Sequence, residues 1–204
     1  MCLAVLLPGC LATCFGQSEQ PEKHRKYPAP VFGVSLALPN ALRGSIYYLP
    51  VDTTRLPDFK KLRPAGTVWA TTLNVPTQAF TAGFPGVTNR IEWFAIDYEG
   101  DFFIDRPGNY AFDLTSDDGS ILRIDGKEII NNDGLHQAVT VRGAAKLTHG
   151  IHHMELSYFQ GPRWEVALKL EVAGPKEKWH VFSMAEFRLP DEPETPEPPE
   201  KPAQ

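Results

Sequence analysis

Cysteine is absent from most of this chain. The sequence has 204 residues and three cysteines, Cys2, Cys10 and Cys14, which all lie near its start. The rest of the chain therefore cannot form a disulfide bond. A folded body of about 150 residues buries enough of its surface to be stable without one. We expect a single domain that does not depend on covalent cross-links.

The chain also lacks an excess of basic residues. Its formal net charge is -5, from 20 Lys and Arg against 25 Asp and Glu. Residues 191–204 hold five acids and one lysine, a charge of -4, which leaves -1 for residues 1–190. Binding to nucleic acid requires a clear positive excess on the binding domain. The composition therefore argues against a nucleic-acid partner.

Long apolar runs are missing as well, because a membrane-spanning helix needs about 20 such residues. The longest candidate, residues 3–15, is shorter, is interrupted by Pro8 and precedes a polar run. This pattern resembles an export signal, so we predict a signal peptide at residues 1–17 and a secreted, periplasmic or cell-surface location. Alternatively, Cys14 ends a lipoprotein-like signal, and this lipid anchor is the chain's contact with a membrane. Export without disulfides favours a bacterial source.

Proline is concentrated towards the two ends of the chain. Residues 18–40 are polar and punctuated by proline, which is typical of a linker. Residues 191–204 are acidic, rich in proline and low in complexity, so they cannot bury apolar surface and we expect a disordered tail. The folded domain is predicted at residues 41–190.

Helical periodicity is not found in this domain, whereas alternation with a period of two is frequent. Apolar residues occupy every second position in three segments, which predicts strands with one buried face. Short strands separated by Gly, Pro and Asp turns predict an all-β fold, an antiparallel β-sandwich or barrel. The alternating residues are Tyr110, Phe112 and Leu114; Met154, Leu156 and Tyr158; and Val166, Leu168, Leu170 and Val172.

A β-hairpin is predicted at residues 121–130. Two short apolar segments flank Asp125-Gly126, a pair that tolerates positive φ at both positions of a two-residue turn. Asparagine is equally common at the first position, so the turn by itself predicts that Asp125→Asn is nearly neutral.

Catalytic motifs are also absent: the sequence has no nucleophile elbow, phosphate loop or HExxH pattern. His152 and His153 are neighbours on a predicted strand, so they point to opposite faces and do not share a metal ion. Asp117 and Asp118 are chain neighbours at a turn, unlike the separated carboxylates of glycoside hydrolases. We therefore expect a protein that is not an enzyme.

One stretch is more specific than any short motif. It consists of a PGNYAF segment from Pro107, SDDGS from Ser116, LRIDG from Leu122, NDGLH from Asn132, and ELSYFQG from Glu155. This order resembles the PA14 (PA-fourteen) domain family, named after the anthrax protective antigen. The resemblance implies a β-sandwich or barrel, and several members of the family bind carbohydrate. In that pattern His136 and His152 have structural roles.

The resemblance also implies a site. In its lectin members two adjacent aspartates, joined by a cis peptide, hold a calcium ion that binds sugar hydroxyls; Asp117 and Asp118 match them. An Asn from a second loop completes the calcium shell, and here Gln160 stands in its place, with Arg163 and Trp164 nearby. We expect calcium at Asp117, Asp118 and Gln160. The sugar would be a glycan or cell-surface polysaccharide, bound by these three residues with Arg163 and Trp164.

Three questions stay open at this point. Asp117-Asp118 is also a good Asx-turn, in which the side chains bond to local N–H groups. Trp164 precedes an alternating strand, where tryptophan is more often a core residue than a sugar-stacking one. The protein itself is either a binding module or a structural domain of the bacterial envelope. An open groove beside Asp117-Asp118 would favour binding, and a loop packed under its neighbours would favour a structural role.

Overall fold

The structure is a computed structural model, and it describes residues 38, 40–79, 83–87 and 90–190. The predicted signal peptide, the lipid anchor at Cys14, nearly all of the linker and the acidic tail lie outside the described residues. The predicted domain at residues 41–190 lies almost wholly inside them.

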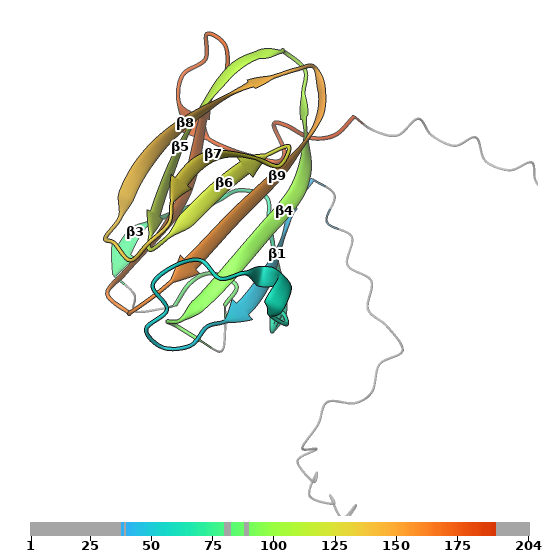
Figure 1. Cartoon of the computed structure of the whole chain (residues 1–204). Coiled ribbons are helices and arrows are strands. Elements are labelled where there is room, and N and C mark those ends of the chain that lie inside the picture. The colour runs from blue at the N-terminus through green and yellow to red at the C-terminus, as the bar shows by residue number, and fades with distance from the viewer. Residues whose placement is uncertain (1–37, 39, 80–82, 88–89, 191–204) are drawn as a thin grey trace, which may run out of the picture. The chain divides into compact units, whose positions relative to one another are not determined.

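Six antiparallel strands form the first sheet (Figure 1). Their spatial order is β2-β1-β4-β9-β6-β7, so the long strands β4 and β9 lie at its centre. The strands are β1 (Leu42–Tyr48), β2 (Gly66–Ala70), β4 (Phe94–Ile104), β6 (Ser120–Ile124), β7 (Lys127–Asn132) and β9 (Gly150–Gln160).

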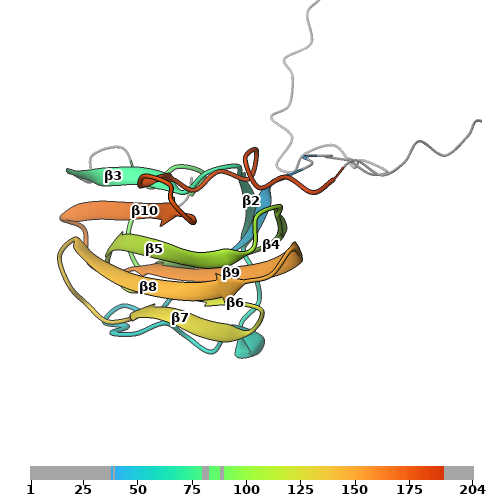
Figure 2. The ribbon, with the colours of Figure 1, turned by 90° about the horizontal axis from the view of Figure 1, so that it is seen from above.

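The second sheet has five strands in the order β11-β10-β5-β8, with β3 also paired to β10. Figure 2 shows β3, β10, β5 and β8 side by side in one layer. The chain passes from this sheet to the first one between β5 and β6, at Asp118 and Gly119. The strands are β3 (Asn74–Ala79), β5 (Gly108–Asp117), β8 (Val139–Leu147), β10 (Glu165–Ala173) and β11 (His180–Val181).

The predicted alternation is confirmed, because the apolar positions of β5, β9 and β10 face the space between the two sheets. Phe112, Leu156 and Leu170 are completely buried there. Burying each such side chain stabilises the fold by about 1.5–3 kcal/mol. The all-β sandwich predicted from the sequence is the observed architecture.

Helical structure is limited to one 3-10 turn, η1 (Phe59–Lys61), in the part of the chain that the structure describes. No helix among these residues is long and apolar enough to cross a membrane. The segment around η1 packs on the outer face of the first sheet through a second, smaller core. This core contains Tyr47, Leu49, Ala95 and Phe159, with Leu56, Phe59, Leu62 and Trp93 packed against it.

The predicted hairpin joins β6 to β7. Asp125 and Gly126 both have positive φ, 52° and 72°, as the two-residue turn requires. We expect Gly126→Val to lower the free energy of unfolding by about 1–3 kcal/mol, because a β-branched residue is strained at positive φ. A Cβ at this position would meet no atom within 4 Å, so the cost would come from the backbone alone. Chemical denaturation measures it, and an unchanged midpoint would contradict the turn.

Asp125 has a second role that the turn did not reveal. Its carboxylate accepts a hydrogen bond from the backbone N–H of His153 (2.9 Å) and contacts Nδ1 of His152 (2.7 Å). The other ring nitrogen of His152 bonds to the carbonyl oxygen of Thr148 (3.0 Å). The side chain therefore ties the hairpin to β9, and the expectation that Asp125→Asn is neutral no longer holds. His152 is buried and His153 is half exposed, so they point to opposite faces as predicted.

Candidate functional site

A groove of about 620 Å³ opens at one end of the sandwich, where β5 passes into β6. Three segments meet there: the end of β5, the loop between β7 and β8, and the loop between β9 and β10. The groove is lined by Asp117, Asp118, Leu135, His136, Gln137, Pro162, Trp164 and Glu165.

Asp118 connects the three segments. One carboxylate oxygen accepts a hydrogen bond from the backbone N–H of His136 (3.1 Å), and the other accepts one from that of Gly161 (2.7 Å). Its partners therefore belong to two distant loops and not to the local N–H groups that an Asx-turn uses. Close packing requires glycine at the next position, since a Cβ on Gly119 would lie 2.8 Å from the backbone nitrogen of Gly134. The side chain of Asp118 organises the groove.

The peptide bond between Asp117 and Asp118 is cis, as the resemblance implied. The Tyr158 hydroxyl lies below it and contacts the Asp117 carbonyl oxygen (2.7 Å) and Oε1 of Gln160 (2.5 Å). The amide nitrogen of Gln160 faces the carbonyl oxygen of Glu165 (3.2 Å). Gln160 is completely buried and does not line the groove. In this arrangement its amide oxygen accepts a hydrogen bond from the Tyr158 hydroxyl beneath the groove and is not exposed in it.

The two carboxylates carry an electrostatic penalty. Burial, the charge of Asp118 and the charge of Glu165 raise the pKa of Asp117 to about 6. Burial also raises the pKa of Asp118, although the two N–H groups that it accepts from oppose this shift. No lysine or arginine is among the residues that line the groove. The site is therefore one in which a bound cation would be stabilised.

Arg163 does not supply that positive charge. Its guanidinium group bonds to both carboxylate oxygens of Glu92, each at 3.2 Å, on the exposed surface. This hydrogen bonding lowers the pKa of Glu92. The structure therefore places Arg163 beside the groove but turned to another partner.

Trp164 is 81% exposed, so of the two positions that the sequence left open, core or groove, the core is excluded. Leu135, on the opposite loop, is 43% exposed. The sequence pattern failed here because Trp164 stands one residue before β10, where the alternation of the strand does not yet apply. An indole ring in this position gives the groove a large apolar surface beside its two carboxylates.

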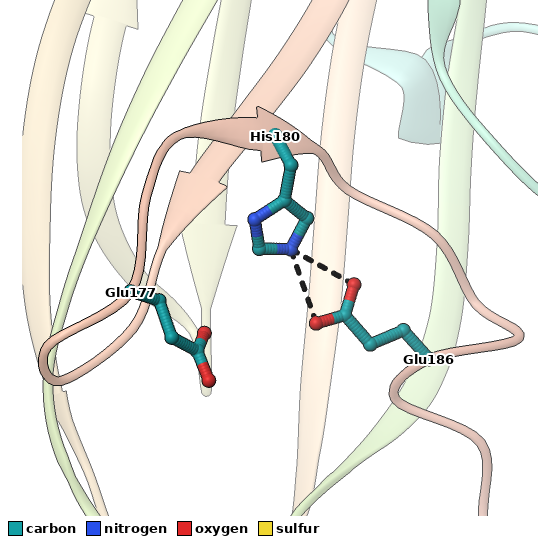
Figure 3. Close-up of side chains that lie close together, drawn as sticks. All are labelled: Glu177, His180 and Glu186. Atoms are coloured by element: carbon teal, nitrogen blue, oxygen red, sulfur yellow. Dashed lines mark hydrogen bonds and ion pairs between the residues drawn. The ribbon is translucent and has the colours of Figure 1, made fainter.

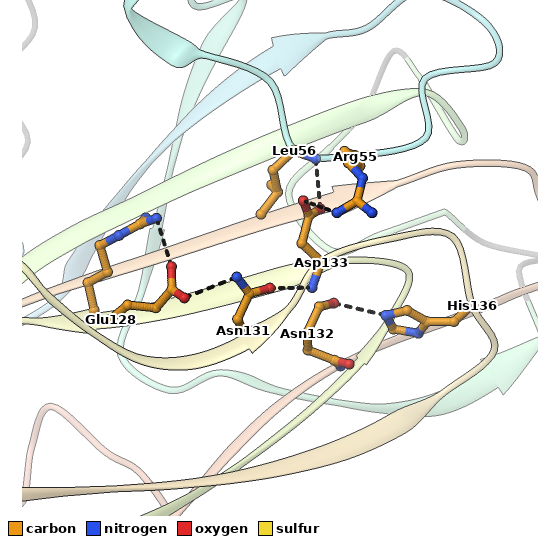
Figure 4. Close-up of polar contacts among 8 residues, drawn as sticks. Arg55, Leu56, Glu128, Asn131, Asn132, Asp133 and His136 are labelled. Atoms are coloured by element: carbon orange, nitrogen blue, oxygen red, sulfur yellow. Dashed lines mark hydrogen bonds and ion pairs between the residues drawn. The ribbon is translucent and has the colours of Figure 1, made fainter.

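His136 holds the loop between β7 and β8 in place. Its ring bonds to the carbonyl oxygens of Asn132 (2.9 Å) and Gln137 (2.8 Å), which confirms a structural role. Asp133, in the same loop, accepts a hydrogen bond from the backbone N–H of Leu56 (2.8 Å) and pairs with Arg55 (Figure 4). The loop between β7 and β8, which forms one side of the groove, is thus held against the segment around η1.

Sequence reasoning brought together Asp117, Asp118 and Trp164, and the structure places all three in one groove. It missed five lining residues: Leu135, Gln137, Pro162, Glu165 and His136, which it assigned a structural role only. Leu135 lies inside the NDGLH motif, which was interpreted as structural, and Pro162 directly follows ELSYFQG, which was interpreted as the source of Gln160 only. Their exposure depends on how the loops fold, which no local pattern reports.

Comparison with protein families gives a direct match: the family model described as the PA14 domain covers residues 59–180. The chain belongs to the PA14 domain family. The match includes β2 to β11, so it takes in the whole groove. A search of curated proteins finds no match.

Solved structures with the same fold include further PA14 domains. The PA14 domain of the MpAFP antifreeze protein is 17% identical, with a TM-score of 0.61, and the match covers 77% of this chain and 94% of that one. A PA14 sugar-binding domain from an RTX adhesin is 18% identical, with a TM-score of 0.60, over 72% and 97% of the two chains. The epithelial adhesin 9 A domain of Candida glabrata, solved with Galb1-3GlcNAc, is 11% identical, with a TM-score of 0.52, over 72% and 88%. At these identities the likeness shows a shared fold.

Proposed function

We propose that this PA14 domain binds carbohydrate in the groove beside Asp117 and Asp118. The observation that carries the proposal is the combination found there: an open groove, two nearly buried carboxylates and an indole ring that is 81% exposed. A groove with apolar walls and a few convergent polar groups is the usual form of a small-molecule site. The alternative, a purely structural domain, gives no reason for an exposed tryptophan at this point.

Each wall of the groove suits one property of a sugar. A pyranose ring has apolar C–H faces, and the Trp164 ring offers a flat surface on which such a face can stack. The Leu135 side chain extends the apolar contact from the facing loop. Hydroxyl groups on the sugar's edge would meet the carboxylates and the Gln137 side chain, which can accept or donate hydrogen bonds.

The site also fits a calcium ion, judged by its donor set. Asp117 and Asp118 place two carboxylates side by side, their pKa values are raised, and no cationic side chain lines the groove. Oxygen ligands of this kind are those that calcium prefers. When bound, calcium would supply positive charge and open coordination positions for vicinal sugar hydroxyls. The Gln160 amide oxygen would reach the groove only after its side chain turned away from Tyr158.

The relatives support this proposal and extend it to the location of the protein. One structural neighbour is described as a sugar-binding domain of an adhesin, and another was solved with a disaccharide. Adhesins act outside the cell, which agrees with the predicted export signal at residues 1–17. We propose a secreted or surface-exposed binding domain that has no catalytic role, because Asp117 and Asp118 are chain neighbours on one side of the groove and cannot flank a glycosidic bond.

Trp164→Ala is expected to weaken glycan binding about 10-fold, because losing about 55 Å² of buried apolar contact at about 25 cal/mol per Å² costs about 1.4 kcal/mol. A glycan array, run with calcium and with chelator, identifies a ligand, and titration calorimetry then compares the variants. Trp179→Ala is the matched control, since Trp179 is 39% exposed and stacks on Arg142, whereas it does not line the groove. Absence of any glycan ligand, or equal loss in the two variants, would refute the proposed function.

A further inference from the structure

A second group of ligand-type side chains lies in the segment that follows β10. Glu177, His180 and Glu186 each direct one ligand atom towards a common space, and these atoms all lie within 4.8 Å of one another (Figure 3). Glu177 comes from the turn after β10, His180 from β11, and Glu186 from the turn at residues 183–187. None of them lines the groove.

One contact of His180 is typical of a metal-binding histidine. Its Nδ1 lies 2.9 Å from the carbonyl oxygen of Lys178, so this nitrogen carries a proton and donates it. Nε2 faces both oxygens of Glu186 at 2.9 and 3.0 Å, and because carboxylate oxygens only accept, this nitrogen also carries a proton in the arrangement shown. A metal ion would take the place of that proton between His180 and Glu186. A backbone carbonyl that fixes the tautomer of the ligating histidine is a common outer partner in metal sites.

The spacing suits a small tetrahedral ion. Zinc binds histidine nitrogen and carboxylate oxygen at about 2.0–2.1 Å, so two ligands of a tetrahedral site are about 3.3 Å apart. The His180–Glu186 pair, at 2.9–3.0 Å, would have to separate by about 0.3 Å. The ligand atom of Glu177 lies within 4.8 Å of the others, so it would have to approach by up to about 1.5 Å. Side-chain rotation can provide such a movement, because Glu177 and Glu186 retain 23% and 41% of their side-chain exposure.

Arg106 orients the third ligand. Its guanidinium group pairs with one oxygen of Glu177, and its carbonyl oxygen accepts a hydrogen bond from the Tyr110 hydroxyl (2.8 Å). Ligating carboxylates are commonly hydrogen-bonded by an outer partner in this way. Asp105 and Arg188 line the same pocket as Arg106, Glu177 and Glu186. Three carboxylates against two guanidinium groups leave a net negative charge around the proposed ion.

We propose that Glu177, His180 and Glu186 form a binding site for a divalent transition-metal ion of the zinc class, separate from the groove. Three protein ligands leave one coordination position for water. The ion would join β11 and the turn at residues 183–187 to the end of β10. It would therefore fasten the last described segment of the chain to the second sheet.

The same side chains also form an ion pair when His180 is protonated, and the two states can be separated by experiment. Zinc has to displace the proton from Nε2, so zinc binding strengthens as the pH rises from about 5.5 to 7.5. An ion pair alone would weaken over the same range. The full chain with Cys2, Cys10 and Cys14 replaced by serine is titrated with zinc chloride in a calorimeter, so that thiols do not compete.

We expect one zinc ion per chain. His180→Ala should weaken its binding by at least about 100-fold, because even the loss of an outer partner costs 10–100-fold. Glu186→Gln should also weaken it. His153→Ala is the matched control, since His153 is half exposed and pairs with one carboxylate, that of Asp101 (2.6 Å).

Cobalt offers a second readout, because a tetrahedral cobalt site gives a strong visible absorption that the His180→Ala variant should lack. The double change Asp117→Asn with Asp118→Asn should leave zinc binding intact, which separates this site from the groove. No zinc binding at pH 7.5, or binding that survives His180→Ala, would overturn the proposal.

Discussion

Asp117→Asn is expected to raise the free energy of unfolding by up to about 3 kcal/mol at about pH 8 and to have little effect near pH 4. The pKa of Asp117 rises from 3.8 to about 6 on folding, and one pKa unit corresponds to about 1.4 kcal/mol. The folded state therefore binds this proton more tightly than the unfolded state does. Stability due to the protonated carboxyl is complete below pH 3.8 and is lost as the pH rises through about 6. Asparagine resembles the protonated carboxyl at every pH.

Asp125→Asn provides the matched control, because its shift has the opposite sign. Burial opposes ionisation of Asp125, but hydrogen bonds from His152 and from the His153 backbone outweigh it and lower its pKa. Its contribution to stability is present above pH 3.8 and is lost as the pH falls through the lower folded value. This variant should be less stable than the native protein at pH 7. Urea denaturation between about pH 2.5 and 8 measures both, and equal pH profiles for the two variants would contradict the assignment.

Calcium is expected to raise the melting temperature of the native protein by about 5–10 °C at a hundredfold excess over its Kd. Such an excess stabilises the folded state by about 2.7 kcal/mol, and a domain of this size gains about 2–4 °C per kcal/mol. The double change Asp117→Asn with Asp118→Asn should abolish the response, because a hard cation needs the carboxylate charges. Asparagine at position 118 has one oxygen, so it can accept only one of the two hydrogen bonds that His136 and Gly161 donate to Asp118. The double variant should therefore be less stable but still folded, and its melting temperature without calcium is the baseline for the response.

Calcium should also reduce the pH dependence of the free energy of unfolding, since a cation beside Asp117 lowers the pKa of its carboxyl group towards the unfolded value. Differential scanning calorimetry with calcium, with magnesium and with chelator tests this. A response that persists in the double variant would place the ion elsewhere in the protein. An absent response in the native protein would remove calcium from the proposed function, while sugar binding through Trp164 would still be tested by its own variant.

Both experiments concern the two carboxylates of Asp117 and Asp118 in the groove. Burial raises the pKa values of Asp117 and Asp118, so ionisation of these carboxyl groups opposes folding, and neither lysine nor arginine is among the residues that line their groove. Residues that cost stability and line a groove are typical of functional sites, where a ligand offsets the cost.

The sequence by itself determined the class of fold and two of the acidic residues that line the candidate groove. Alternating apolar residues in β5, β9 and β10 specify which face of each strand is buried, because successive side chains point to opposite sides. The Asp125-Gly126 hairpin is equally local, since two residues with positive φ suffice to reverse the chain. The order of the PA14 motifs identified the family and pointed to Asp117 and Asp118.

Tertiary structure alone decided the state of the side chains around that site. The packing of the loops after β7 and β9 against each other leaves Trp164 exposed. It also turns Gln160 towards Tyr158 and not towards the groove, and it pairs Arg163 with Glu92. The second role of Asp125 and the meeting of Glu177, His180 and Glu186 have the same origin. Each requires contacts between segments that are not neighbours in a regular strand, and no periodicity in the chain encodes such distances.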